Sequence, residues 1–173
     1  LNANSQTAER LLDAGADANA ALRAGETLLM RAARTGNPRI AKALLAHGAK
    51  VDARESVQRQ SALMWAAAQG HGEVTRILIE NGADPRARST SGFTPLLFAA
   101  RSGDAASARV LLDGGVDVNE AAPDGASPLL VAIASALASA VRVSGTAPFV
   151  YMSARPRAAC SSMLWPVSGL VSA

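Results

Sequence analysis

The chain has 173 residues, 49% of them hydrophobic and only 3% aromatic, so any core must consist mainly of alanine, leucine and valine. This length is enough for one compact domain or one short solenoid. The net charge of +3 comes from residues 135–173, which contain three arginines and no acidic residue, whereas residues 1–134 contain 14 basic and 14 acidic side chains. A region without net charge gives no reason to expect a nucleic-acid partner. The single cysteine, Cys160, cannot form a disulfide within the chain.

The first predicted element, within residues 8–19, is one helix followed by a loop. Its paired Leu11 and Leu12 are followed three residues later by Gly15, a pattern that recurs further along the chain. Glycine often ends a helix because it adopts the left-handed conformation without a Cβ clash. This stretch matches only the second half of the unit that repeats later, so we interpret the chain as a fragment whose N-terminus, with any signal peptide, lies upstream.

The same short phrase then recurs four times with a period of 33 or 34 residues. Each copy begins with threonine or serine and carries a leucine two residues later, at Leu29, Leu63, Leu96 and Leu129. A fixed period in this range predicts a solenoid of stacked supersecondary units. The four copies are residues 27–33, 61–67, 94–100 and 127–133.

Each complete unit contains two apolar helical stretches, and a glycine ends each of them. The first stretch follows the repeated phrase and includes a pair of small residues, which allows neighbouring helices to approach closely. The second carries a pair of aliphatic residues three positions before its glycine. The glycines after the first stretch are Gly36, Gly70 and Gly103, and those after the second are Gly48, Gly82 and Gly115.

With this phrase and the loop that follows the second glycine, the unit resembles the ankyrin repeat, and its Ala- and Arg-rich composition is similar to bacterial members of that family. The resemblance covers about residues 3–134 as a half repeat, three complete repeats and the start of another. It implies an all-α solenoid of stacked antiparallel helix pairs with projecting hairpin loops. The family's histidine after Pro-Leu is replaced throughout, which implies more apolar packing and looser loops. The replacing residues are Met30, Met64, Leu97 and Leu130.

The last repeat is degenerate, because Ala136 occupies the position of the glycine that ends the first helix. Alanine in the left-handed conformation costs roughly 1–2 kcal/mol, while within a helix it is the best former of all. We therefore predict one continuous helix over about residues 128–143. This helix carries Leu137 and Val141 past the stack and does not fold them back onto it.

These observations predict that the chain has two regions. Residues 1–144 are predicted to be the repeat array, and residues 145–173 an irregular and mobile tail interrupted by prolines. From residue 135 onwards the chain lacks Asp, Glu, Lys, Asn, Gln, His and Ile. This change of composition inside a repeat has two interpretations, a frameshifted or foreign sequence and a natural divergent cap.

No motif in the chain predicts catalysis, a cofactor or a metal site. His47 and His71 occupy helix-end and turn positions of the repeats, and neither has a second ligand at the spacing that zinc requires. The uncharged run over residues 125–141 is 17 residues long and contains the repeat phrase, so we interpret it as a repeat helix and not as a membrane span.

The resemblance also implies where a partner binds, since the family typically uses the concave face of the first helices and the loop tips. Trp65 is flanked by Arg31, Arg34 and Arg101, an arrangement suited to an acidic partner segment with a hydrophobic side chain. The alternative is that Trp65 and Phe98 fill the packing between repeats and that the arginines pair with neighbouring acids. The predicted contact residues are Arg31, Arg34, Trp65, Gln69, Arg88, Phe93, Phe98 and Arg101.

These features predict a non-enzymatic scaffold for protein–protein interaction. The chain is expected to be a monomer that binds a protein partner and neither nucleic acid nor a membrane. One alternative is an accessory module of a longer enzyme or regulator whose active domain lies outside this fragment, and another is a broken product without function. The compartment is not determined by the sequence.

Overall fold

The computed structural model describes the backbone of residues 2–144 and the side chains of residues 5–138. Within this part of the chain the structure contains eight α-helices and one short 3-10 helix, η1 (Arg23–Gly25). The inner helices, which begin at the repeated phrase, are α2 (Leu28–Thr35), α4 (Ala62–Gln69), α6 (Pro95–Ser102) and α8 (Pro128–Ser144). The outer helices are α1 (Asn2–Asp13), α3 (Pro38–Ala46), α5 (Gly72–Glu80) and α7 (Ala105–Asp113).

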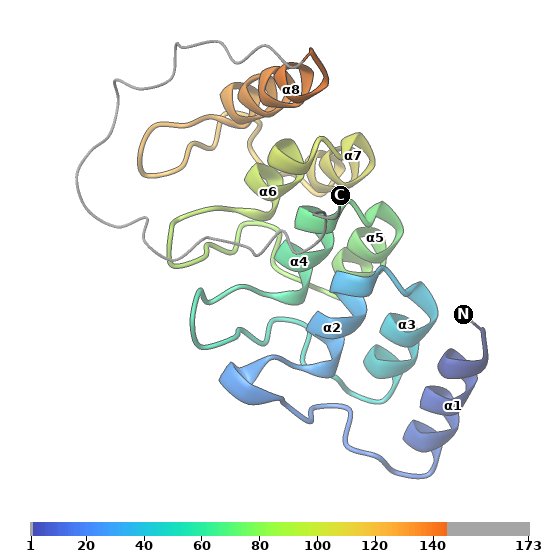
Figure 1. The fold of residues 1–173 in the computed structure, drawn as a ribbon. Coiled ribbons are helices and arrows are strands. Elements are labelled where there is room, and N and C mark those ends of the chain that lie inside the picture. Colours follow the sequence, from blue (N-terminus) through green and yellow to red (C-terminus); the bar gives the residue numbers. More distant parts are fainter. Residues whose placement is uncertain (1, 145–173) are drawn as a thin grey trace.

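The helices form two layers, and each layer follows the order of the repeats (Figure 1). In the inner layer α2 packs on α4, α4 on α6 and α6 on α8, while α1, α3, α5 and α7 stack in the outer layer. The hairpin loops project from the side of the inner helices. The only β pairing in the described residues is two isolated bridges, Ala21 with Thr27 and Arg54 with Ser61. The predicted all-α solenoid is confirmed.

Local chemistry at the helix ends explains why these segments are helical. Each inner helix begins with a hydroxyl that accepts a hydrogen bond from the third helical amide; Thr27 accepts from Met30 at 3.3 Å. Each of α2, α4 and α6 ends at a left-handed glycine, with φ of 66° at Gly36. At Gly36 a Cβ would lie 2.5 Å from the ring of His71, whose Nε2 lies 3.1 Å from the carbonyl oxygen of Arg34. His71 therefore joins two repeats, a structural role.

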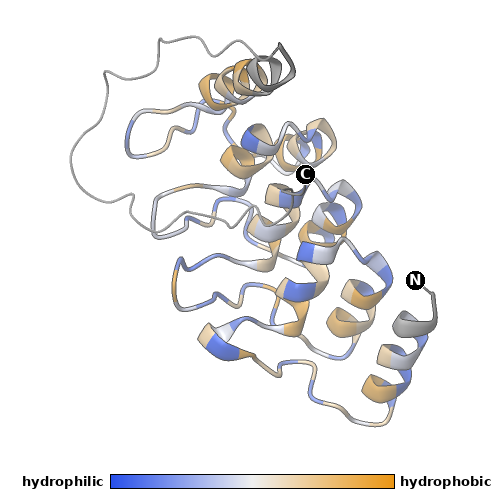
Figure 2. Cartoon of the chain, in the orientation of Figure 1, coloured by the Kyte–Doolittle hydropathy of each residue, from blue (hydrophilic) through white to orange (hydrophobic). Residues whose placement is uncertain are grey.

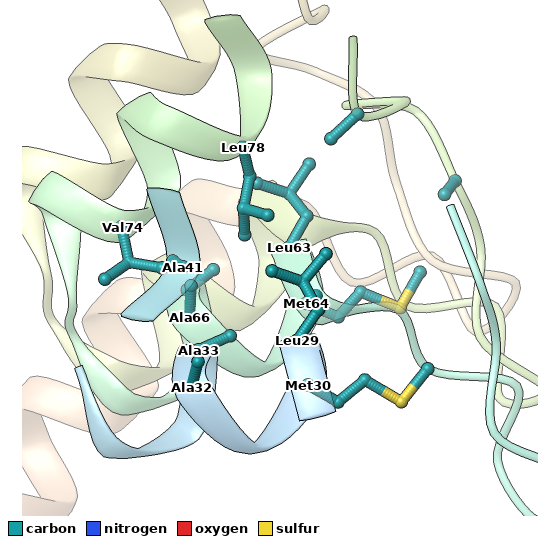
Figure 3. Packing of buried hydrophobic residues seen from close by; sticks show 14 of the residues in the cluster. Leu29, Met30, Ala32, Ala33, Ala41, Leu63, Met64, Ala66, Val74 and Leu78 are labelled. Atoms are coloured by element: carbon teal, nitrogen blue, oxygen red, sulfur yellow. The ribbon is translucent and has the colours of Figure 1, made fainter. Parts of the chain in front are cut away.

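The core lies between the two layers and between successive repeats. The residues that replace the family's histidine in the complete units, Met30, Met64 and Leu97, are fully buried, which confirms the expected apolar packing. Ala33 and Ala66 are also fully buried, and their small side chains let α2 and α4 approach closely. Figure 3 shows these alanines between the two helices, with Leu29 and Leu63 beside them.

The hairpin loops are joined to one another by hydrogen bonds that do not involve histidine. The hydroxyl of Ser56 donates to the carbonyl oxygen of Ala24 at 2.9 Å, and the amide of Thr90 donates to that of Gln58 at 2.8 Å. Within the second loop, the buried carboxylate of Glu55 accepts three backbone amides at 2.6–2.9 Å. These bonds order the loop of residues 55–60, which lies in the one repeat step that is 34 residues long instead of 33.

Helix α8 is continuous from residue 128 to residue 144, which confirms the prediction for the last repeat. Figure 2 shows that it is hydrophobic along the part whose side chains are described. Leu129, Leu130, Ile133 and Leu137 are 49–68% exposed, so Leu137 indeed lies outside the packed stack. The predicted position of the Val141 side chain and the predicted irregular tail, residues 145–173, lie outside the described residues.

Substitution of the leucine at one repeat position should therefore lower the free energy of unfolding much more in the middle of the array than at its end. Leu63 is 0% exposed and Leu129, its equivalent in the last repeat, is 68% exposed. We expect Leu63→Ala to lower the free energy of unfolding by about 2–5 kcal/mol, because it leaves a cavity. Leu129→Ala, the matched control, should change it by no more than about 0.5 kcal/mol. Urea denaturation of the chain measures both, and equal losses would contradict the structure.

Candidate protein-interaction surface

The inner helices present one kind of charge. Helices α2, α4 and α6 together contain three arginines, Arg31, Arg34 and Arg101, and no aspartate or glutamate. With Trp65 and Gln69 of α4 they form what we call the inner-helix surface. Trp65 is half-buried and Gln69 is exposed. This surface is positive although residues 1–134 have no net charge.

The first feature of the surface is a cation–π contact between two repeats. The guanidinium of Arg34 lies 5.3 Å from the ring centroid of Trp65. The indole packs against the core, and its buried Nε1 has no hydrogen-bond acceptor among the described residues. Trp65 thus contributes to packing between repeats while it also supports an arginine at the surface.

The second feature is a stack in which Arg101 lies over two phenyl rings. Its guanidinium is 5.0 Å from the centroid of Phe98 and 5.8 Å from that of Phe93, and the two rings are 5.6 Å apart. Phe98 is only 3% exposed, so it supports Arg101 from beneath and its own side chain is not free for contact with a partner. Desolvation by burial lowers the pKa of Arg101 below its usual value.

Acidic neighbours divide the three arginines into two classes. Glu26 lies 3.2 Å from Nε of Arg31 and 3.9 Å from Nη2 of Arg34, so one carboxylate is shared by two guanidinium groups. Arg101 forms no ion pair within the described part of the chain. The alternative that the arginines pair with neighbouring acids therefore holds for Arg31 and Arg34, while Arg101 keeps an uncompensated charge.

The sequence interpretation did not include Glu26. A signal was present, because Glu26 directly precedes Thr27 and so lies one residue before the repeated phrase, where the other units have Gln60 and Phe93. The equivalence of Glu26 and Phe93 also shows that the same position pairs with arginine by charge in one repeat and by ring contact in another.

Arg88 lies apart from the inner helices, in the hairpin loop before α6. Its Nη2 is 2.6 Å from Oε1 of Glu120, and its Nη1 donates to the carbonyl oxygen of Gly92 at 3.0 Å and lies 3.4 Å from that of Ala121. The guanidinium of Arg88 therefore joins two adjacent loops and is already paired. Of the predicted contact residues, the structure brings Arg34 to Trp65 and Arg101 to Phe93 and Phe98, and it leaves Arg88 in the loops.

Metal binding and membrane insertion were the other two possibilities to compare with the described residues. They contain no group of three histidine, cysteine, aspartate or glutamate side chains that could hold a metal ion. Among the same residues, no helix combines the length and the apolar character needed to cross a bilayer.

Comparison with known proteins agrees with the architecture. A family model of ankyrin repeats in three copies matches residues 1–89, and a single ankyrin-repeat model matches residues 91–122. An ankyrin repeat-containing protein of Treponema pallidum (strain Nichols) is 38% identical over 96 residues, which are 56% of this chain and 32% of the relative.

Two relatives from animals share shorter parts. The ankyrin repeat and KH domain-containing protein mask-1 of Caenorhabditis elegans is 36% identical over 84 residues, 49% of this chain and 3% of its own length. The ankyrin repeat and SAM domain-containing protein 6 of Mus musculus is 40% identical over 70 residues, 40% of this chain and 8% of its own. The matched part of this chain thus spans a third or less of each of these relatives. Together the repeat period, the two-layer stack and these matches show that the chain belongs to the ankyrin-repeat family, whose repeats are generally modules for protein–protein interaction.

Proposed function

We propose that this chain is a non-enzymatic interaction module that binds an acidic segment of a protein partner on the inner-helix surface, with the loop tips at its edge. The observation that carries the proposal is the charge of the inner helices, which have three arginines and no acid in α2, α4 and α6. Arg101 in particular has no acidic partner in the described structure.

The aromatic contacts support this proposal physically. A guanidinium that stacks on a ring keeps its N–H groups directed outwards in the guanidinium plane, where they can donate two parallel hydrogen bonds to a carboxylate. Holding Arg34 over Trp65 and Arg101 over Phe98 also reduces the side-chain entropy that binding would cost. Tryptophan and arginine are the residues most often found at the energetic centre of interfaces.

The remaining predicted residues are proposed to lie at the edge. Gln69, at the end of α4, and Arg31, half of whose side chain is exposed, offer polar groups next to the two stacked arginines. Arg88 is exposed but bonded to Glu120, so we expect a small contribution from it, as is usual for exposed ion pairs. Phe93 and Phe98 act through Arg101.

A second candidate is that the repeats are an accessory module of a longer enzyme or regulator. The lengths of the relatives favour it, since the matched region is 3–32% of each of them and two of them are named for additional KH or SAM domains. The proposed surface is the same in both cases.

Selection from a random peptide library on immobilised protein tests the proposal. We expect the selected peptides to be enriched in aspartate and glutamate, because the charged residues within α2, α4 and α6 are all arginines. Their binding should weaken in high salt. With Arg101→Gln, most of the enrichment in aspartate and glutamate should disappear. The matched control is Arg109→Gln, which removes an exposed arginine from the outer helix α7. Peptides without acidic enrichment, or equal losses in both variants, would refute the acidic partner.

Removal of Glu26 should strengthen binding of the selected acidic peptides. Glu26→Gln frees Arg31 and Arg34 from their shared counter-ion and removes a negative charge that repels the peptide. We expect an affinity gain of about two- to fivefold, equivalent to about 0.4–1 kcal/mol for a partly exposed pair. Fluorescence anisotropy of labelled peptide measures it, with Glu73→Gln on the outer helix α5 as control. An unchanged affinity would mean that these arginines do not contact the peptide.

A further inference from the structure

Helix α8 has a largely exposed apolar face, which we call the α8 stripe. It consists of the four large side chains that are 49–68% exposed: Leu129, Leu130, Ile133 and Leu137. At about 100° per residue, these four positions fall within an arc of about 100° around the helix. An apolar arc of this width is what a helix of a folded domain normally turns towards a core.

The face of α8 that packs on the stack lies on the other side of the helix. It consists of the residues that are buried or partly buried: Pro128, Val131, Ala132 and Ser135. By the same helical geometry the centre of this face lies about 160° from the centre of the α8 stripe. Since α8 packs on α6 at the end of the inner layer, the stripe points away from the described array (Figure 1).

The positions that form the α8 stripe are covered in the complete repeats. The equivalents of its first three residues in α4 are all 0% exposed: Leu63, Met64 and Ala67. The α8 stripe is therefore the surface that other elements of the array bury when a repeat lies in the middle of the stack.

One residue of the stripe differs in size from its equivalents. Ile133 stands where the complete repeats have alanine, at Ala33, Ala67 and Ala100. The distance between packed helices depends on the side chains at the contact, so Ile133 would hold a further inner helix farther away than the inner helices are from one another. The stripe thus fits a helix with large apolar side chains of its own better than it fits another ankyrin repeat.

The spacing and the charge of the stripe make it complementary to itself. Leu129, Ile133 and Leu137 follow one another at steps of four residues, so two antiparallel copies centred on Ile133 place Leu129 of each opposite Leu137 of the other. Residues 125–141 carry no charge that would oppose this contact. Arg142 is the only charged residue within α8, and antiparallel pairing separates the two 142 positions by about 27 Å along the helices.

We propose that the α8 stripe is a homodimer interface, in which the α8 helices of two copies of this chain pack antiparallel about a two-fold axis at Ile133. A second copy offers the same stripe already folded as a helix, so no backbone has to be ordered when the two meet. This inference is independent of the inner-helix surface, and it makes the chain a dimer where its sequence suggested a monomer.

The size of the stripe sets the expected strength of the dimer. From Leu129 to Leu137 it spans about 12 Å of helix. This contact is small beside a standard interface, which buries about 800 Å² per partner. We therefore expect a dissociation constant in the micromolar range, with the monomer predominating below it. The comparison of Leu63→Ala with Leu129→Ala in urea is made at such low concentrations, because dimerisation makes unfolding depend on concentration.

Sedimentation equilibrium of the full chain tests the dimer. Over a series from low micromolar to millimolar protein, we expect the mass to rise from 17.6 kDa towards twice that value. Ile133→Asp should weaken the dimer at least about tenfold, because it buries two like charges at the axis. Val57→Asp, which alters a 63% exposed side chain in a hairpin loop, is the matched control and should leave the mass unchanged.

Charge exchange tests the antiparallel arrangement. Leu129→Lys and Leu137→Glu should each weaken the dimer when studied alone. An equimolar mixture of the two variants should recover it, since the introduced lysine then meets the introduced glutamate and the remaining two leucines meet each other. A parallel pair would not recover in this way, and a folding defect in either variant cannot produce the recovery.

The remaining outcomes overturn the proposal. A mass of 17.6 kDa at every concentration, or a dimer that Ile133→Asp leaves intact, shows that the stripe is not the interface. In either case, the rate of maleimide labelling of Ile133→Cys in a Cys160→Ser background identifies the alternative. Slow labelling means that other residues of the chain cover the stripe, and fast labelling means that it is open to a different protein. High salt should not dissociate this apolar dimer, whereas it weakens acidic peptides on the inner-helix surface, so the two proposals fail separately.

Discussion

Every other feature of this structure depends on the close stacking of the inner helices through small side chains. No repeat can bury its apolar face alone, so each must present a flat, complementary face to the next. Ala33, Ala66 and Ala99 are fully buried at this contact, and the methionines that accompany two of them fill the space towards the loops. Because small residues recur at the same positions of this contact, the inner helices can lie close together in a similar way in each repeat. This packing aligns the exposed positions of successive repeats.

Alignment by itself does not determine what the aligned residues do. Arg34 and Arg101 occupy equivalent positions, yet Arg34 shares Glu26 with a second arginine, whereas Arg101 lies over two phenyl rings and pairs with no acid in the part of the chain that the structure describes. A glutamate in one repeat and a phenylalanine in another, at the same position before the phrase, produce this difference. The same repeated unit thus places two arginines with one shared acid at α2, no charged side chain on α4 and a single arginine on α6.

The C-terminal end of the array shows what happens when one local signal is missing. Without a glycine at residue 136, α8 continues for 17 residues, and no second helix completes the unit within the described residues. Four of its large apolar side chains remain about half or more exposed in that part of the structure. The helix packs on α6 through one face only, so the last repeat adds less to stability than the central ones.

The sequence by itself determined the repeat period, the ends of the inner helices, the all-α stack and the continuous last helix. These features depend on short-range chemistry: a hydroxyl at a helix start, a glycine with positive φ at its end, or an alanine in place of that glycine. It also indicated the residues of the inner-helix surface, since their repeat position determines which way they face. Only the tertiary structure decided that Phe98 is buried, that Glu26 pairs with two arginines and that Arg88 is bound to Glu120. It also decided that Arg101 has no ion pair among the described residues. These contacts join side chains at different positions of the unit or in different repeats, and their geometry depends on how closely the helices and loops pack, which residue spacing along the chain does not specify.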